Sequence, residues 1–160
     1  MEKPIVVGHT SKTNGVARCD IVLAFVRGEN ILAQAFIELK YFKKAKPGSG
    51  AEASKDNRFG LFMDLENLEQ YRSLCNKGET IPLCYEIAVA ENATYSNPHS
   101  HSTIKTGNGC WTDDSRRIIK DGGKNAVHYV SHDSIDLQGN YLFTWTTFSE
   151  KQHCLIIRMQ

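Results

Sequence analysis

The chain has 160 residues, of which 41% are apolar. This is enough to bury one hydrophobic core, so we expect a single domain over residues 1–160. Nineteen lysines and arginines nearly balance eighteen aspartates and glutamates, so any basic surface for a nucleic acid must be local. No stretch approaches about 18 continuous apolar residues, and the apolar run near the N-terminus is too short for a secretion signal. These features argue against a membrane-spanning or exported protein.

The cysteines indicate a reducing compartment. They number five, stand at positions 19, 75, 84, 110 and 154, and include no CxxC pair. Cys19, Cys84 and Cys154 lie in strongly apolar runs. An odd number of thiols in such surroundings is typical of reduced, mostly buried cysteines. We therefore expect a cytoplasmic protein.

The first predicted elements are strands. Residues 4–8 read as a short strand and residues 10–15 as a polar turn. Residues 19–27 and 31–42 are rich in β-branched and aromatic side chains, and the sequence Gly-Glu-Asn at 28–30 separates them. Such a separator is typical of a hairpin turn, so we predict an antiparallel hairpin.

A loop, a helix and a strand are expected next. Residues 43–57 join a lysine cluster to small polar residues, which is the composition of an exposed, mobile loop. Apolar residues spaced by three and four then predict an amphipathic helix from about Gly60 to Asn76, ended by Gly78. Its apolar stripe comprises Leu61, Leu65, Leu68 and Leu74, with Phe62 and Tyr71 alongside. Residues 81–90 are apolar at nearly every position, which predicts a strand buried on both faces.

The remainder of the chain divides into a loop and further strands. Residues 91–125 are poor in apolar side chains and predict a long loop with a short helical turn, and loops of this length are usually functional or disordered. The end of the chain predicts two or three strands, with turns at residues 133–134 and 139–140. The sequence therefore predicts an α/β or α+β domain with a mixed central sheet flanked by helices.

Two carboxylates meet across the predicted hairpin. With a three-residue turn, Arg27 faces Ile31 and paired positions sum to 58, which places Asp20 opposite Glu38. A two-residue turn would place Glu38 on the diagonal, but the two acids remain neighbours in either register because opposed β-carbons are only about 5 Å apart. The hairpin therefore predicts a close carboxylate pair.

A carboxylate pair of this kind favours a divalent metal. Like charges held together are tolerated chiefly when a cation or a shared proton compensates them. Mg²⁺, or Mn²⁺ in its place, suits a site of one or two carboxylates completed by water and substrate phosphate. Lys40 shares a strand face with Glu38 and would stabilise developing negative charge or orient a hydroxide. The alternative is a solvated hairpin face, and the apolar residues on both strand faces around these charges weigh against it.

These residues also resemble a known family. The segments ARCDIVLAF and AFIELKYFK, then a predicted helix and IPLCYEIAV, resemble the core of the PD-(D/E)xK nuclease superfamily over roughly residues 16–90. That superfamily includes many restriction endonucleases, resolvases and repair nucleases. The resemblance implies that Asp20 and Glu38 bind the metal, that the carbonyl of Leu39 joins them, and that Lys40 is the catalytic lysine.

The resemblance further implies a restriction-endonuclease-like fold and a Mg²⁺-dependent endonuclease that hydrolyses phosphodiester bonds with metal-activated water. We expect nucleic acid as the partner, DNA in preference to RNA, and a homodimer is an assembly open to a short nuclease. Two alternatives stay open. One is a catalytically inactive module of the same fold that binds nucleic acid or a protein, and the other is a structural or inhibitory protein.

Basic residues offer two candidate nucleic-acid contacts. Three lysines directly follow the motif, namely Lys43, Lys44 and Lys46. They are interpreted either as phosphate-binding groups or as a solvated run. A second basic group lies in the long loop beside Trp111 and comprises Arg116, Arg117 and Lys120. There an aromatic ring is available to stack on a base.

Other polar residues are assigned simpler roles. His99, His101 and Cys110 lack the paired spacing of a structural zinc site, so we expect polar loop histidines. His128 and His132 have the spacing of a helical ligand pair but lie in strand-like sequence, which favours a surface or core role. Three acids in the first turns of the predicted helix suit its dipole and are assigned no chemistry, namely Asp64, Glu66 and Glu69.

Overall fold

The computed structural model describes residues 5–6, 16–17, 19–27, 30–43, 51–75, 81–99, 102–116 and 134–159. Its centre is a five-stranded mixed sheet of order β3-β4-β5-β7-β6. The strands are β3 (Ile21–Arg27), β4 (Asn30–Phe42), β5 (Leu83–Ala90), β6 (Trp145–Ser149) and β7 (Gln152–Met159). The helix α1 (Ala51–Cys75) connects β4 to β5, which run parallel, while the other neighbours in the sheet are antiparallel. The class is therefore α+β, as predicted.

Smaller elements complete the described fold. The strands β1 (Ile5–Val6) and β2 (Val16–Ala17) pair as a separate two-stranded sheet. A 3₁₀ turn, η1 (Thr112–Ser115), is the helical turn expected within the long loop. Two strands, β6 and β7, form the C-terminal part of the sheet, whereas residues 134–144 are irregular apart from a bridge between Trp111 and Leu142.

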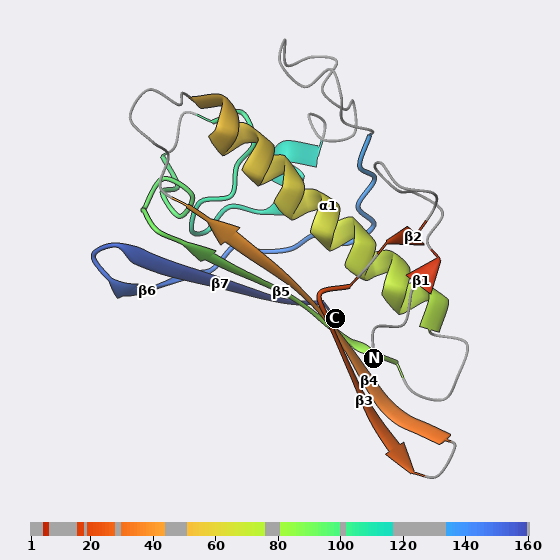
Figure 1. Cartoon of the computed structure of the whole chain (residues 1–160). Coiled ribbons are helices and arrows are strands. Elements are labelled where there is room, and N and C mark those ends of the chain that lie inside the picture. Colours follow the sequence, from red (N-terminus) through yellow and green to blue (C-terminus); the bar gives the residue numbers. More distant parts are fainter. Residues whose placement is uncertain are drawn as a thin grey trace.

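The sheet has two unlike faces (Figure 1). α1 lies over one of them, which we call the inner face; on β4 and β5 its residues are Phe36, Glu38, Lys40, Phe42, Cys84, Glu86, Ala88 and Ala90. Along β5, buried side chains alternate with exposed or half-buried ones. The exposed and half-buried side chains point to the opposite side of the sheet, which we call the outer face. The prediction that β5 is buried on both faces was therefore wrong. Its outward residues are apolar even though no described segment of the chain buries them.

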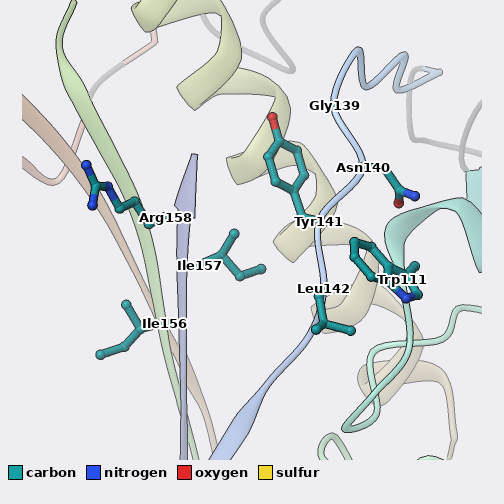
Figure 2. A pocket seen from close by; sticks show the side chains of 8 residues that line it. All are labelled: Trp111, Gly139, Asn140, Tyr141, Leu142, Ile156, Ile157 and Arg158. Atoms are coloured by element: carbon teal, nitrogen blue, oxygen red, sulfur yellow. The ribbon is translucent and has the colours of Figure 1, made fainter. Parts of the chain in front are cut away.

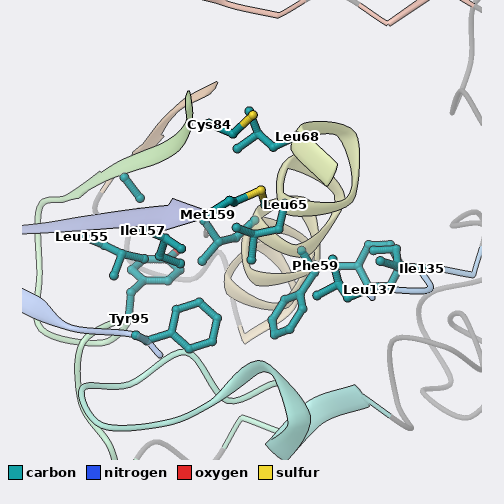
Figure 3. Close-up of a cluster of buried hydrophobic side chains, with 14 of the residues drawn as sticks. Phe59, Leu65, Leu68, Cys84, Tyr95, Ile135, Leu137, Leu155, Ile157 and Met159 are labelled. Carbon is teal, nitrogen blue, oxygen red and sulfur yellow. The ribbon is translucent and has the colours of Figure 1, made fainter. Parts of the chain in front are cut away.

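The core forms between α1 and the inner face. Leu61, Leu65 and Leu68 are fully buried, so the predicted leucine stripe is largely confirmed. Figure 3 shows Leu65 and Leu68 facing β7 side chains that include Met159. Leu74, however, is 42% exposed. The half-buried Cys75 continues the spacing of four from Tyr71 instead, because that position lies closer to the buried stripe than position 74 does.

The helix begins earlier than its apolar pattern indicates. It starts at Ala51, so residues 51–57 are helical where a loop was predicted. Alanine, glutamate and lysine are strong helix formers, and this segment contains all three. The absence of large apolar residues there removed the periodic signal but not the helix propensity.

Candidate metal and catalytic site

Near Asp20 and Glu38 the hairpin has the predicted register, although its turn is shorter than predicted. Ile21 pairs with Ile37, so paired positions sum to 58 at this end of the hairpin. At the other end Arg27 pairs with Asn30, which leaves a two-residue connection. A shift of register between Phe25 and Val26 restores the predicted pairing. Such a bulge inserts one residue into one strand and so offsets the shorter turn.

Asp20 lies immediately before β3 and reaches β4 through its side chain. Its Oδ2 accepts a hydrogen bond of 2.8 Å from the backbone N–H of Leu39. Asp20 is exposed, whereas Glu38 in the neighbouring strand is only 5% exposed. The structure therefore brings the two predicted acids together, one at the surface and one beneath it.

Glu38 occupies an environment that disfavours its charge. Burial raises the pKa of this carboxyl from its ordinary 4.5 to about 8, and the charges of Asp64 and Asp20 act in the same direction. Its Oε1 is buried without a hydrogen-bond partner. Burial, followed by the charge of Glu38, also raises the pKa of the Tyr71 hydroxyl. A cation placed beside Glu38 would remove this penalty.

Glu86 is a buried acid whose role was missed in the sequence. It pairs with Glu38 in the parallel register of β4 and β5, and it is fully buried. Both of its carboxyl oxygens lack a hydrogen-bond partner. Burial raises its pKa from 4.5 to about 10, with the charge of Asp64 adding to the effect. The available signal was a lone acid at an inward position of an otherwise apolar strand.

Lys40 and Asp64 form an ion pair across the sheet and the helix. The Lys40 Nζ lies 2.6 Å from Asp64 Oδ2, and the two side chains are 26% and 18% exposed. Gly60 makes room for this lysine, because a β-carbon at position 60 would stand 2.9 Å from Nζ. Burial raises the pKa of Asp64 although the charge of Lys40 opposes the shift. Because α1 begins at Ala51, Asp64 lies well inside the helix, so the dipole role predicted for it was wrong, and its partner is Lys40 instead.

The other helix acids fasten the chain that follows the long loop. Glu66 accepts a hydrogen bond from the backbone of Asp136. Glu69 accepts bonds from the backbones of Gln138 and Gly139 and from the Tyr141 hydroxyl. These two acids hold residues 136–141 against α1.

The cluster thus contains four carboxylates, those of Asp20, Glu38, Asp64 and Glu86, beside one ammonium group. In the described part of the chain no three acidic, histidine or cysteine side chains are already arranged around a single ion position. Oε1 of Glu38 and both carboxyl oxygens of Glu86 nevertheless suit a hard divalent cation, since they are buried, unpartnered and located on adjacent strands. Asp20 is the acid that would face incoming solvent or substrate.

Only part of the predicted nucleic-acid contacts can be placed. Lys43 is exposed directly after β4, while Lys44 and Lys46 lie outside the described residues. Arg116 pairs with Asp113 at 2.8 Å and donates to the carbonyl of Gly139 at 3.1 Å, so its charge serves contacts between loops. Arg117 and Lys120 also lie outside the described residues.

The histidine-rich loop shows no metal centre among its described residues. His99 is exposed, and its backbone N–H donates to Asn97. Cys110 is half-buried against the core. The side chains of His101, His128 and His132 lie outside the part of the chain that the structure describes.

A cavity of about 380 Å³ lies apart from the acidic cluster. Figure 2 shows Trp111, Asn140 and Leu142 on one side of it and Ile156 and Arg158 of β7 on the other. Trp111 is 44% exposed, so its ring is accessible there. The cavity contains no carboxylate of the cluster.

Comparisons with known proteins give no relative: no family model, no curated protein and no solved structure matches the chain. None of the described helices is long and apolar enough to cross a membrane.

Proposed function

We propose that this protein is a metal-dependent nuclease that hydrolyses phosphodiester bonds in nucleic acid, with DNA the favoured substrate. The observation that carries the proposal is the pair formed by Glu38 and Glu86, two buried carboxylates on adjacent parallel strands, in which one oxygen of Glu38 and both oxygens of Glu86 lack a hydrogen-bond partner. Such a pair is destabilising unless it shares protons or a cation. The exposed Asp20 and the partly exposed Lys40 lie beside it, which suits a cation that is open to a substrate.

Hard oxygen ligands select Mg²⁺ or Mn²⁺ for this role. Glu38 and Asp20 would hold the ion, as the resemblance to PD-(D/E)xK nucleases implies, and Glu86 would add a third carboxylate. The Leu39 carbonyl is a further candidate ligand. When bound, the ion would lower the pKa of a water molecule and polarise the phosphate. The hairpin, the connecting helix and the parallel strand β5 also support a restriction-endonuclease-like fold.

The protein's own residues would then position the reacting groups. Lys40 would donate a hydrogen bond to the oxygen that gains negative charge in the transition state. Asp64 holds the Lys40 ammonium at 2.6 Å and so fixes where that donor stands. Gly60 leaves the space that Nζ occupies. Lys43 lies directly after β4, three residues beyond Lys40, and would contact the backbone phosphates of the nucleic acid.

Two observations favour the alternative of a catalytically inactive module that binds nucleic acid or a protein partner. Asp64 already neutralises Lys40, and no three ligands converge in the described residues. In that case the cluster would be a remnant in which Glu38 and Glu86 stay protonated. The two proposals differ in whether the protein cleaves a bound nucleic acid when a metal ion is present.

The test is incubation of the protein with plasmid, single-stranded DNA and RNA, with Mg²⁺ or Mn²⁺ and with a chelator. The nuclease proposal expects cleavage that requires the ion and that Asp20→Asn and Glu38→Gln each abolish. Glu150→Gln, which changes an exposed turn residue in the same way, is the matched control and should cleave normally. Retarded migration of a nucleic acid without cleavage under every condition would instead favour the binding module.

A further inference from the structure

The outer face of the sheet is an apolar surface. The register places Ala33, Ala35, Ile37, Leu39 and Tyr41 of β4 on it, beside Leu83, Tyr85, Ile87 and Val89 of β5. None of these residues is charged. Figure 1 shows α1 over the other side of the sheet, and no described segment of the chain covers this one. On β7 the register adds one charged side chain to this face, the exposed Arg158, which pairs with Tyr85. A face with so few basic side chains is unsuited to a nucleic acid, because phosphates require them.

The exposed side chains on this face are large. Six of them are between 42% and 68% exposed, namely Leu23, Phe25, Leu39, Tyr41, Leu83 and Ile156. Side chains of roughly 200 Å² each, about half exposed, present about 600 Å² of surface. Ile37, Tyr85 and Ile87 are half-buried and add to it. A continuous apolar patch of this size stands at the upper end of what typical monomers expose, and such patches are often functional.

We propose that this outer face binds a second copy of the chain and forms a symmetric homodimer with the two sheets packed face to face. A stable interface buries about 800 Å² on each partner, which the outer face approaches without any other surface. A sheet face made mostly of apolar side chains is self-complementary under a twofold axis, because each apolar row meets an equivalent row of the partner. Sheets packed in this way lie about 10 Å apart with their side chains interdigitated.

The arrangement leaves the acidic cluster free. Glu38, Lys40 and Glu86 point to the inner face, so a dimer formed through the outer face does not cover them. Each copy would carry its own cluster on the side away from the interface. The proposal is independent of whether that cluster cleaves nucleic acid.

Sedimentation velocity of the purified full chain, from micromolar to about 100 µM, tests the proposal. The expected species has twice the chain mass of 18.0 kDa. Leu23→Lys and Ile156→Lys introduce charge at exposed positions of the outer face and should weaken association at least tenfold. Leu74→Lys makes the same change on an exposed site of α1 and should leave the dimer intact.

Circular dichroism melts of all the variants establish that each is folded, since none of these side chains is buried. A wild-type protein that is monomeric throughout the concentration range would overturn the proposal and assign the face to a different occupant. Dimers that persist in both outer-face variants would also overturn it, as would equal dissociation of the Leu74→Lys variant.

Discussion

The acidic cluster predicts an unusual dependence of stability on pH in the metal-free protein. The pKa of Glu38 is about 8 in the folded chain, against an ordinary value of 4.5. Between these values the folded protein retains a proton that the unfolded chain has released. The contribution of Glu38 to the unfolding free energy therefore falls as the pH rises from about 4.5 to about 8, by about 1.4 kcal/mol per pH unit. The whole window corresponds to about 5 kcal/mol, which rivals the total stability of a small domain.

Glu38→Gln isolates this effect, because glutamine has a similar shape and does not titrate. Urea unfolding followed by circular dichroism, in chelator at several pH values from 5 to 8, measures the difference in unfolding free energy from wild type. The unfolding free energy of the variant, measured relative to that of wild type, should increase steadily as the pH rises. The Glu150→Gln variant should run parallel to wild type. Parallel profiles for Glu38→Gln and wild type would contradict this prediction, because they would mean that Glu38 ionises freely in the folded protein.

Three further predictions concern basic side chains. Lys40→Ala should slow metal-dependent cleavage by orders of magnitude while leaving calorimetric Mn²⁺ binding largely intact, since the lysine acts on charge that develops in the transition state; equal rates would exclude a catalytic role. Replacing Lys43, Lys44 and Lys46 by alanine should weaken nucleic-acid binding for every sequence and reduce the salt dependence by roughly one unit of slope per lost contact; an unchanged slope would show a merely solvated run. Arg58→Met should lower the unfolding free energy by about 3 kcal/mol in urea melts, because the buried guanidinium donates hydrogen bonds to the carbonyls of Thr94 and Ile104 in the loop after β5. A loss below about 1 kcal/mol would contradict this role.

The hairpin and its acids were the part of the fold that local pattern could predict. Residues 21–27 and 31–42 are rich in β-branched and aromatic side chains, and turn residues separate the two segments. Each segment therefore has the other as its pairing partner. The expectation that Asp20 lies beside Glu38 followed from that pairing, and in the structure Asp20 immediately precedes β3. The bulge after Phe25 could not be predicted, because it offsets a shorter turn and leaves no mark on the residues that pair beyond it.

Glu86 and Asp64 show where local pattern fails. Glu86 reaches the cluster only because β4 and β5 run parallel and in a register that pairs it with Glu38. Asp64 reaches Lys40 only because α1 crosses the inner face of the sheet. Both relations are set by the packing of elements far apart in the sequence. The periodicity of a helix or strand fixes which residues share a face, but it does not state which other element covers that face.

The exposed outer face has the same explanation. The apolar residues of β5 predicted burial on both sides, since a parallel strand is usually covered on each face. In the described chain a single helix covers one side. The outward apolar residues of β5 therefore stay uncovered in the described chain, and a second copy of the chain would bury them.

If Glu38 and Glu86 together bind a divalent cation, a calorimetric titration of the metal-free protein with Mn²⁺ should show it. Wild type should bind Mn²⁺ saturably, Glu38→Gln and Glu86→Gln should each bind it much more weakly, and Glu150→Gln should bind it as wild type does. The absence of any Mn²⁺ binding by wild type, or binding of the same affinity in both site variants, would contradict this expectation.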